Sequence, residues 1–379
     1  MSNHDSTASA LVVSDDRWQL LAEQLIIGTA VVEGSAVAIF MTDPVVMPAV
    51  EAFVAECYRV GAQPQVLATD ERFDRLAVQY ASDAVLAQAG ALELASMEWA
   101  DVHVSFRAMI APEPTALTSE GEARVAMQRA GKGAVSTSRW QNTRWCLVRV
   151  PTPEWAAFIN EPFDSLLEEF FGGCLADWTN LKPRWDQLCA ELDTASIIRL
   201  VSADTDLSFG VAGRTWVSFA GEANLPDGEV ATAPLETAIN GHITFPGSLW
   251  FAGIEVCDLR LEFVSGLVAE VTATTGAAFV RKLLETDEGA RRVGELGIGT
   301  NRLMRTVTGD LLIDEKILGT VHLALGRSYP QCGGVNVSSL HWDIVKDLRS
   351  PDSFLYADGA ELISGGVPVN SLDVATREG

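Results

Sequence analysis

The chain contains 379 residues, of which 48% are hydrophobic and 21% are charged. This composition is typical of a globular protein with two or three hydrophobic cores, at about 150 residues per domain. Asp and Glu together number 51 against 27 Lys and Arg, so the formal net charge is −24. Such an acidic surface repels phosphate backbones and anionic lipid headgroups, which argues against a nucleic acid or a membrane as a partner.

The N-terminal segment has no basic stretch followed by an apolar one, so the sequence predicts no signal peptide. The longest unbroken apolar run, residues 36–41, is far shorter than the ~20 residues that span a bilayer. Six cysteines are scattered without a CxxC pair, which argues against a disulfide scaffold and against a cysteine zinc site. We therefore expect a soluble protein with cytoplasmic localisation and reduced thiols.

The first half of the chain alternates between segments of helical periodicity and short apolar runs. This alternation predicts an α/β domain with a mostly parallel sheet over residues 15–193, preceded by a mobile polar tail over residues 1–14. A helix is predicted over residues 46–60, and strands are predicted over residues 36–41, 65–68, 101–106 and 145–150. No GxGxxG sequence follows any of these strands, so the domain lacks the dinucleotide-binding fingerprint.

The second half of the chain shows alternating polar and apolar residues punctuated by glycines. This texture predicts a β-rich, barrel-like α+β domain over residues 194–379. Strands are predicted over residues 215–219, 242–245, 259–263 and 267–271. One helix is predicted over residues 277–296, with Phe279, Leu283 and Leu284 at core spacing.

Three side chains suited to metal binding lie close together in the second domain. His322 lies in an apolar, strand-like run, and His341 and Asp343 are two residues apart, so a strand would place both on one face. Imidazole nitrogens and carboxylate oxygens are common ligands of divalent metals. Taken alone, each histidine is also consistent with a buried imidazole bonded to the backbone, and Asp343 with a loop or edge residue.

Two glutamates extend this candidate site. Glu229 follows a Pro-Asp-Gly turn that delivers it to the start of a strand, and Glu295 lies at the end of the helix predicted over residues 277–296. Both are surrounded by small and apolar residues, where an unpaired carboxylate is costly to bury, so a cation is a natural partner. By itself, either glutamate is also consistent with a surface or salt-bridged residue.

Five segments of the second half together carry a family resemblance. They are Asn-Leu-Pro-Asp-Gly-Glu-Val at 224–230, Glu-Leu-Gly-Ile-Gly-Thr-Asn at 295–301, Asp-Glu-Lys-Ile at 314–317, Gly-Thr-Val-His-Leu-Ala-Leu-Gly-Arg-Ser-Tyr-Pro at 319–330 and His-Trp-Asp at 341–343. In order and approximate spacing they resemble the M29 metallo-aminopeptidases, the group of aminopeptidases T and S. The segment from Arg144 to Trp155, with its Pro-Thr-Pro turn, extends the resemblance into the first half.

The resemblance implies a hydrolase that releases N-terminal amino acids from peptides with the help of two divalent metal ions, Zn, Co or Mn. It also implies a homodimer. The metal ligands carried over from the family are Glu229, Glu295, His322, His341 and Asp343. Two ions about 3.5–4 Å apart need a shared carboxylate, and Glu295 is the expected bridge.

The resemblance also assigns catalytic roles. Tyr329 is expected to stabilise the oxyanion, and Glu295 or Glu229 to carry the proton to the leaving amine. Glu315 is either a residue that orients a metal ligand or a salt-bridge partner of Lys316 or of nearby arginines.

Two departures leave the reaction open. The segment 331–340 is shorter than in the peptidases, which affects the expected substrate preference. The superfamily also includes enzymes similar to 2,5-dihydroxypyridine dioxygenases, which use one Fe(II) and have a histidine in place of Glu295.

The retained Glu295 favours hydrolysis, whereas His322, His341 and Asp343 alone match an iron-binding triad for ring cleavage of a hydroxylated pyridine. A metal-stabilised scaffold without catalysis, or an amidase with a non-peptide substrate, is a third alternative.

Overall fold

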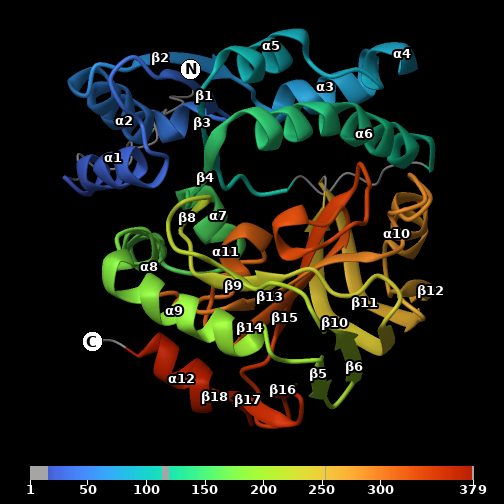
Figure 1. Ribbon diagram of the computed structural model, residues 1–379. Helices are drawn as coiled ribbons and strands as arrows, with labels where there is room; N and C mark the ends of the chain where they lie inside the picture. Colours follow the sequence, from blue (N-terminus) through green and yellow to red (C-terminus); the bar gives the residue numbers. More distant parts are fainter. Residues whose placement is uncertain (1–15, 113–118, 252, 378–379) are drawn as a thin grey trace, which may run out of the picture.

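The computed structural model describes residues 16–112, 119–251 and 253–377, and the expected mobile tail over residues 1–14 lies outside them. The N-terminal part, at the top of Figure 1, is a layered α/β unit, and the C-terminal part below it is built mainly from sheets. The predicted fold class is therefore confirmed. Within the described ranges, no helix has the length and apolar character needed to cross a membrane.

A parallel sheet in the order β2-β1-β3-β4-β8 forms the centre of the N-terminal part. The first four strands are those predicted from the sequence. β1, which helices cover on both faces, is apolar throughout, whereas the edge strand β2 is largely exposed. The fifth strand comes from a later part of the chain. The bounds are β1 Ala36–Met41, β2 Gln63–Ala68, β3 Val102–Ala108, β4 Arg144–Val150 and β8 Asn224–Leu225.

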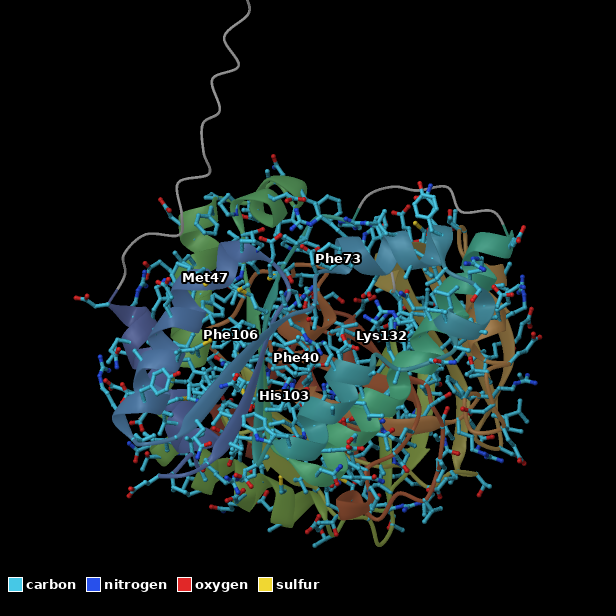
Figure 2. The ribbon with its side chains drawn as sticks, turned by 90° about the horizontal axis from the view of Figure 1, so that it is seen from above. Phe40, Met47, Phe73, His103, Phe106 and Lys132 are labelled. Carbon is cyan, nitrogen blue, oxygen red and sulfur yellow. The ribbon has the colours of Figure 1, made fainter. Side chains whose placement is uncertain are left out.

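Helices cover both faces of this sheet. Val37 and Ile39 of β1 share a core with Phe53, whereas the alternate residues Ala38 and Phe40 pack against helix α5 on the other face. In Figure 2, Phe40 and Phe106 lie on the strands, and Lys132 lies on α6. The bounds are α1 Arg17–Gly28, η1 Pro44–Val46, α2 Met47–Arg59, α3 Glu71–Tyr80, α4 Asp83–Leu86, α5 Ala91–Trp99 and α6 Ser119–Asn142.

Three helices connect the parallel sheet to the C-terminal part: α7 Pro153–Phe158, α8 Phe163–Cys174 and α9 Trp178–Leu192. Proline at the first position and the Thr152 side chain, which accepts a hydrogen bond from the Trp155 amide, explain where α7 begins. Apolar side chains from both parts, from Trp18 to Ala375, form one continuous buried cluster. The two parts therefore share a core.

Two antiparallel sheets form most of the C-terminal part. The larger has the order β12-β11-β10-β6-β5-β16-β17-β18. The bounds are β5 Ile197–Ser202, β6 Thr205–Gly210, β10 Ile239–Phe251, β11 Ile254–Val264, β12 Leu267–Thr272, β16 Phe354–Ala357, β17 Ala360–Ser364 and β18 Val367–Pro368. Long hairpins such as β10–β11 follow the glycine-punctuated alternation in the sequence.

The smaller antiparallel sheet, which we call the site sheet, has the order β15-β14-β13-β9-β7. Its bounds are β7 Val217–Phe219, β9 Glu229–Thr232, β13 Val293–Gly299, β14 Thr320–Gly326 and β15 His341–Asp347. Trp342 of β15 is buried and stacks on Phe251, with ring centres 5.0 Å apart, so this face packs towards the larger sheet. The neighbouring residues His341 and Asp343 therefore point to the opposite face.

One predicted helix is wrong over most of its length. The helix expected over residues 277–296 ends at Leu283, and Glu295 lies within strand β13 instead of at a helix end. Gly289, Gly294 and Gly297 follow the apolar triplet, and glycine is a poor helix former, so the chain turns and enters the sheet. The remaining helices here are α10 Ala277–Leu283, α11 Leu311–Asp314, η2 Pro330–Cys332 and α12 Asn370–Thr376.

Candidate metal centre

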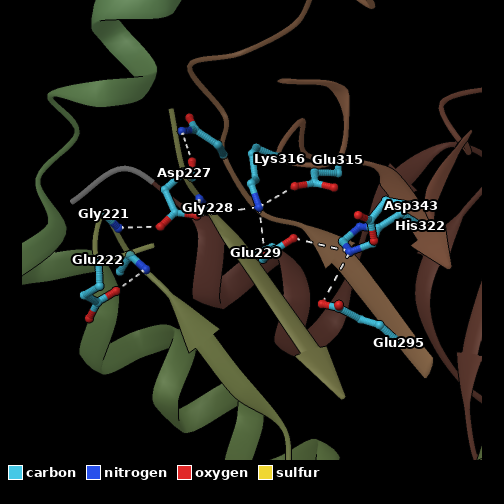
Figure 3. Close-up of polar contacts among 12 residues, drawn as sticks. Gly221, Glu222, Asp227, Gly228, Glu229, Glu295, Glu315, Lys316, His322 and Asp343 are labelled. Carbon is cyan, nitrogen blue, oxygen red and sulfur yellow. Dashed lines mark hydrogen bonds and ion pairs between the residues drawn. The ribbon is translucent and has the colours of Figure 1, made fainter. Parts of the chain in front are cut away.

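Four neighbouring strands bring the five predicted ligands together. Glu229 is the first residue of β9, Glu295 lies in β13, His322 lies in β14, and His341 and Asp343 lie in β15. Antiparallel pairing of these strands brings side chains distant in sequence onto one face of the site sheet. Figure 3 shows Glu229, Glu295, His322 and Asp343 gathered at this place.

The potential ligand atoms form two groups, and within each group all atoms lie within 4.8 Å of one another. The first group is Glu229, Glu315 and His322, and the second group is Glu295, His341 and Asp343. Each group thus combines one imidazole with two carboxylates, a donor set that suits Zn, Co or Mn. Glu315 was expected only to orient a ligand or form a salt bridge, and the structure gives it a position among the potential ligands.

Glu295 belongs to the second group and also faces His322 of the first group. Its Oε1 is 3.8 Å from Nε2 of His322, and its Oε2 is 3.4 Å from Nε2 of His341. His322 Nε2 also lies 3.4 Å from Oε2 of Glu229, and His341 Nε2 lies 3.5 Å from Oδ1 of Asp343. One carboxylate therefore has an oxygen directed to each histidine, which is the arrangement that a bridging ligand requires.

A fully buried lysine, Lys316, forms ion pairs with the two carboxylates of the first group. Nζ of Lys316 lies 2.7 Å from Oε1 of Glu229, 2.8 Å from Oε1 of Glu315 and 3.8 Å from Oδ1 of Asp227 (Figure 3). Lys316 is 0% exposed, so its ammonium has no access to water and depends on these carboxylates. The salt bridge between Glu315 and Lys316, one of the two alternatives considered for Glu315, is thus present.

Asn301 holds the segments that carry this cluster. Its side-chain Nδ2 donates to the backbone oxygen of Asp227 at 2.7 Å, and its backbone N–H donates to the backbone oxygen of Lys316 at 2.9 Å. The Asp227 carboxylate in turn accepts the amides of Gly221 and Gly228 at 2.7 and 2.9 Å. Asn301, the last residue of the 295–301 motif, therefore connects the segments that carry Asp227 and Lys316. The sequence pattern alone does not reveal this role.

The charges of the two groups shift the pKa of their members. Burial alone would lower the pKa of His322, but the bond to Glu295 and the charges of Glu229 and Glu315 raise it to about 10. Burial likewise lowers the pKa of His341, while Asp343 and Glu295 raise it to about 8. Burial raises the pKa of Glu229 and of Glu315, although Lys316 opposes this shift. The protein thus concentrates negative charge where a cation would sit.

His341 and Tyr329 are positioned by the segment after β14. Nδ1 of His341 lies 2.9 Å from the backbone oxygen of Arg327, which fixes this nitrogen as the donor and leaves Nε2 to face Glu295. The Tyr329 ring centre lies 5.2 Å from that of His341. Burial, together with the charge of Glu295, raises the pKa of Tyr329, so its hydroxyl keeps its proton and can donate it in a hydrogen bond.

The fold and site define a class of protein: a parallel α/β layer over antiparallel sheets, with a carboxylate–histidine metal centre on one sheet. The family described as thermophilic metalloprotease (M29) matches residues 15–361. The chain therefore belongs to the M29 family, and the predicted enzyme class, a metal-dependent hydrolase, is confirmed.

Characterised relatives agree with this assignment. Aminopeptidase 2 of Geobacillus stearothermophilus is 25% identical over 367 residues, covering 88% of this chain and 87% of the relative. Aminopeptidase T of Thermus thermophilus is 30% identical over 239 residues, covering 56% and 58% of the two chains.

Two solved structures share the fold. AmpT from Thermus thermophilus superimposes with a TM-score of 0.77 at 24% identity, covering 93% of this chain and 99% of that one. A 2,5-dihydroxypyridine dioxygenase from Pseudomonas putida superimposes with a TM-score of 0.56 at 16% identity, covering 94% and 98%. Because one fold serves both enzymes, the fold does not distinguish the two reactions, and the site must.

Proposed function

We propose that the protein is an aminopeptidase that releases N-terminal amino acids from peptides by means of a water activated by two divalent metal ions, Zn, Co or Mn. The observation that carries this proposal is the position of Glu295, whose two carboxylate oxygens face His322 and His341. A shared carboxylate between two ligand groups serves two ions better than one.

The residues present fit two such ions. Oε2 of Glu229 is buried and has no hydrogen-bond partner among the described residues, although it faces His322, so it is available to a cation. In their ionised forms, the carboxylates of the cluster and Lys316 carry a net charge of −4, which two divalent ions neutralise. The carboxylates counted are those of Asp227, Glu229, Glu295, Glu315 and Asp343.

When bound, the ions would lower the pKa of a water molecule and polarise the scissile carbonyl. The residues would then act as follows. Glu229, Glu295, Glu315, His322, His341 and Asp343 would hold the ions. Glu295 or Glu229 would carry the proton to the leaving amine, and the Tyr329 hydroxyl would donate a hydrogen bond to the developing oxyanion. The carboxylates of the centre would also attract the free α-amino group of the peptide.

Ring cleavage by one Fe(II) is the second candidate, supported by the shared fold of the dioxygenase. It would use His322, His341 and Asp343 as the iron ligands. In this structure His322 belongs to the first group and the other two residues belong to the second. The division of the three residues between two groups favours the two-metal aminopeptidase.

Metal analysis and a paired assay test the proposal. The metal content of protein purified without chelators is measured first. One portion is then loaded with Zn, Co or Mn and another with Fe(II), and each is incubated with aminoacyl amides and, separately, with dihydroxypyridines under air. Two ions per chain and amide hydrolysis are expected. One iron per chain, oxygen uptake and inert peptides would replace the proposal with the dioxygenase. Bound metal without turnover of either substrate would leave the metal-stabilised scaffold.

The proposal includes a homodimer and the division of the chain near residue 193. Light scattering measures the dimer directly. A single species with the mass of one chain would remove the dimer from the proposal without affecting the chemistry.

A further inference from the structure

Four arginines line one hollow of the C-terminal part, which we call the arginine hollow. Its volume is about 520 Å³, and its lining residues are Arg302, Met304, Arg305, Leu318, Arg349 and Arg377. No aspartate or glutamate is among these residues, although acidic residues outnumber basic ones by 51 to 27 in the chain. The arginine hollow therefore gathers positive charge on a protein whose net charge is −24.

Three separate segments bring the arginines together. Arg302 and Arg305 lie in the segment that follows β13, Arg349 lies just beyond the end of β15, and Arg377 follows α12. No residue of the two ligand groups of the metal centre is among the lining residues. The arginine hollow is therefore lined by a different set of side chains from the candidate metal centre.

Two of the arginines are held in place by the surrounding chain. Nε of Arg302 donates to the backbone oxygen of Thr376 at 2.6 Å, and its Nη2 donates to Oδ1 of Asp373 at 2.8 Å. Nη1 of Arg349 donates to the backbone oxygen of Arg305 at 2.6 Å. The side chains of Arg302 and Arg349 are 32% and 30% exposed. Because both are already ordered, a ligand that binds them causes little further loss of side-chain freedom.

The other two arginines have most of their hydrogen-bonding capacity unused. The Arg305 side chain forms no hydrogen bond or ion pair with any residue that the structure describes, and only its backbone N–H donates, to Oε2 of Glu169 at 2.8 Å. Nε of Arg377 donates to Oδ2 of Asp373 at 3.0 Å, and this side chain is 66% exposed. Each guanidinium carries five N–H donors, so both can bind a further acceptor.

The carboxylates in contact with these residues do not balance the four guanidiniums. Asp373 pairs with two of them, and Asp347 pairs with one. Glu169, which accepts the backbone N–H of Arg305, adds a third negative charge. Four positive charges against three negative ones leave a local charge of +1. The arginine hollow is thus suited to an anion, which the rest of the acidic surface would repel.

We propose that the arginine hollow binds a small molecule that carries at least two phosphate groups. Arginine binds phosphate oxygens through pairs of parallel hydrogen bonds, and four guanidiniums provide donors for more than one such group. A phosphate group has about two negative charges near neutral pH and three acceptor oxygens, so it uses these donors better than a carboxylate does.

The size of the arginine hollow agrees with a ligand of this class. Small-molecule sites have volumes of about 300–1,000 Å³. The arginine hollow, at about 520 Å³, falls within this range. Met304 and Leu318 add apolar surface to the lining, against which a part of the ligand without phosphate would pack. The proposal is independent of the aminopeptidase activity, since it requires neither a metal ion nor a peptide.

The arginine hollow is built on segments that also support the metal centre. Arg302 directly follows Asn301, and the backbone N–H of Leu318 donates to the backbone oxygen of Asn301 at 3.1 Å. Asn301 in turn bonds to the segments of Asp227 and Lys316. Phosphate groups also bind divalent metals, so the test uses the metal-free protein, in which a bound phosphate cannot be held by a metal ion.

Titration calorimetry of the metal-free, full-length protein tests the proposal, with pyrophosphate as the probe. The buffer contains about 0.15 M salt, where the Debye length is about 8 Å, so distant acidic residues are screened. Pyrophosphate is expected to bind once per chain and at least about tenfold more tightly than inorganic phosphate, sulfate or citrate. Absence of pyrophosphate binding, or equal binding of sulfate, would overturn the proposal. Equal binding of citrate would overturn the assignment to phosphate groups.

Variants connect the binding to the arginines. Arg305→Gln should weaken pyrophosphate binding at least about tenfold without changing thermal stability, because its guanidinium has no partner within the described ranges. Arg305→Lys keeps the charge and should retain part of the affinity. Arg377→Gln should also weaken binding.

Arg199→Gln is the matched control. Arg199 is an exposed arginine that pairs with Asp206 on the larger antiparallel sheet, and it does not line the arginine hollow. Its replacement removes the same charge from the protein and should leave pyrophosphate binding unchanged. If Arg305→Gln and Arg377→Gln both bind pyrophosphate as the unmodified protein does, or if Arg199→Gln weakens binding equally, the arginine hollow is not the site.

Discussion

Gly297 of β13 pairs directly with His322 of β14, and a Cβ atom at Gly297 would lie 2.1 Å from Cε1 of the imidazole. The imidazole therefore occupies the space that any other residue at position 297 would need. Packed interiors leave no room for such an overlap, so a larger residue must displace His322. The glycine-rich motif that contains Glu295 thus also fixes the position of a histidine on the neighbouring strand.

Gly297→Ala should disable the first group without removing a ligand. We expect metal content to fall from two ions to one per chain and hydrolysis to fall at least about a hundredfold, since a small misplacement of a catalytic group has an effect of this size. Mass spectrometry of bound metal measures the first effect. Gly172→Ala is the control, because its Cβ would meet Leu303 at an ordinary 3.6 Å. Two tightly bound ions in Gly297→Ala would contradict the assignment of His322.

Lys316→Met should destabilise the metal-free protein far more than the metal-loaded protein. Lys316 is the cation that Glu229 and Glu315 contact when no metal is bound, and removing one partner of a buried ion pair costs about 3–5 kcal/mol. Divalent ions should restore most of the loss. Thermal unfolding with chelator and with saturating zinc measures both states.

Lys132→Met provides the comparison for Lys316→Met. Lys132 pairs with Asp74 at 2.6 Å, but both side chains are about one-third exposed, at 32% and 34%. Screening by water limits such a pair to about 1 kcal/mol or less. Equal destabilisation of Lys316→Met with and without metal would show that Lys316 does not act as a substitute cation.

Tyr329→Phe should retain both metal ions and lower kcat by about 10²–10³, the effect of removing one oxyanion donor. The phenyl ring preserves the contact with His341, so only the hydroxyl is lost. His341→Ala is the contrasting variant, and it should lose metal from the second group. If Tyr329→Phe has normal kcat, the hydroxyl is not the oxyanion donor.

Metal affinity should increase with pH. In the metal-free protein the pKa of His341 is raised to about 8 and that of His322 to about 10, so both imidazoles are protonated at pH 7. A metal binds only the neutral imidazole, so protons must leave on binding, and the apparent affinity should rise as pH passes through 8 towards 10. Calorimetry in buffers of different ionisation enthalpy counts these protons. An affinity that is constant from pH 6 to 9 would show that the histidines do not bind the metal.

The sequence predicts those parts of the fold that local periodicity determines. Strand β1 is apolar on both faces because helices cover both, and the two-residue spacing of His341 and Asp343 places them on one face of β15. Glu295 was assigned to a helix because Phe279, Leu283 and Leu284 have helical spacing. That spacing ends with α10, and the glycines that follow serve strand packing.

Residues brought together by the topology have no local signature. Asp227 and Lys316 lie in separate motifs, and Asn301, which donates hydrogen bonds to the backbone oxygens of both, helps to hold them as neighbours. Trp140 comes from helix α6 of the other half of the chain, and its ring centre lies 6.4 Å from that of Tyr329. Neither relationship is visible in spacing or composition, since each depends on how distant segments pack.

Strand β8 links the two parts of the molecule mechanically. Asn224 and Leu225 extend the parallel sheet by pairing with Leu147 and Val148, and only three residues separate them from Glu229. Any motion of the parallel sheet away from the site sheet would therefore strain residues 226–228 or displace Glu229. A fragment ending at residue 193 would lack β8 and expose the edge of β4, which favours aggregation. The last strand of the parallel sheet and the ligand Glu229 thus belong to one continuous segment. Separating the two parts of the chain would remove a strand from the sheet and disturb the metal centre.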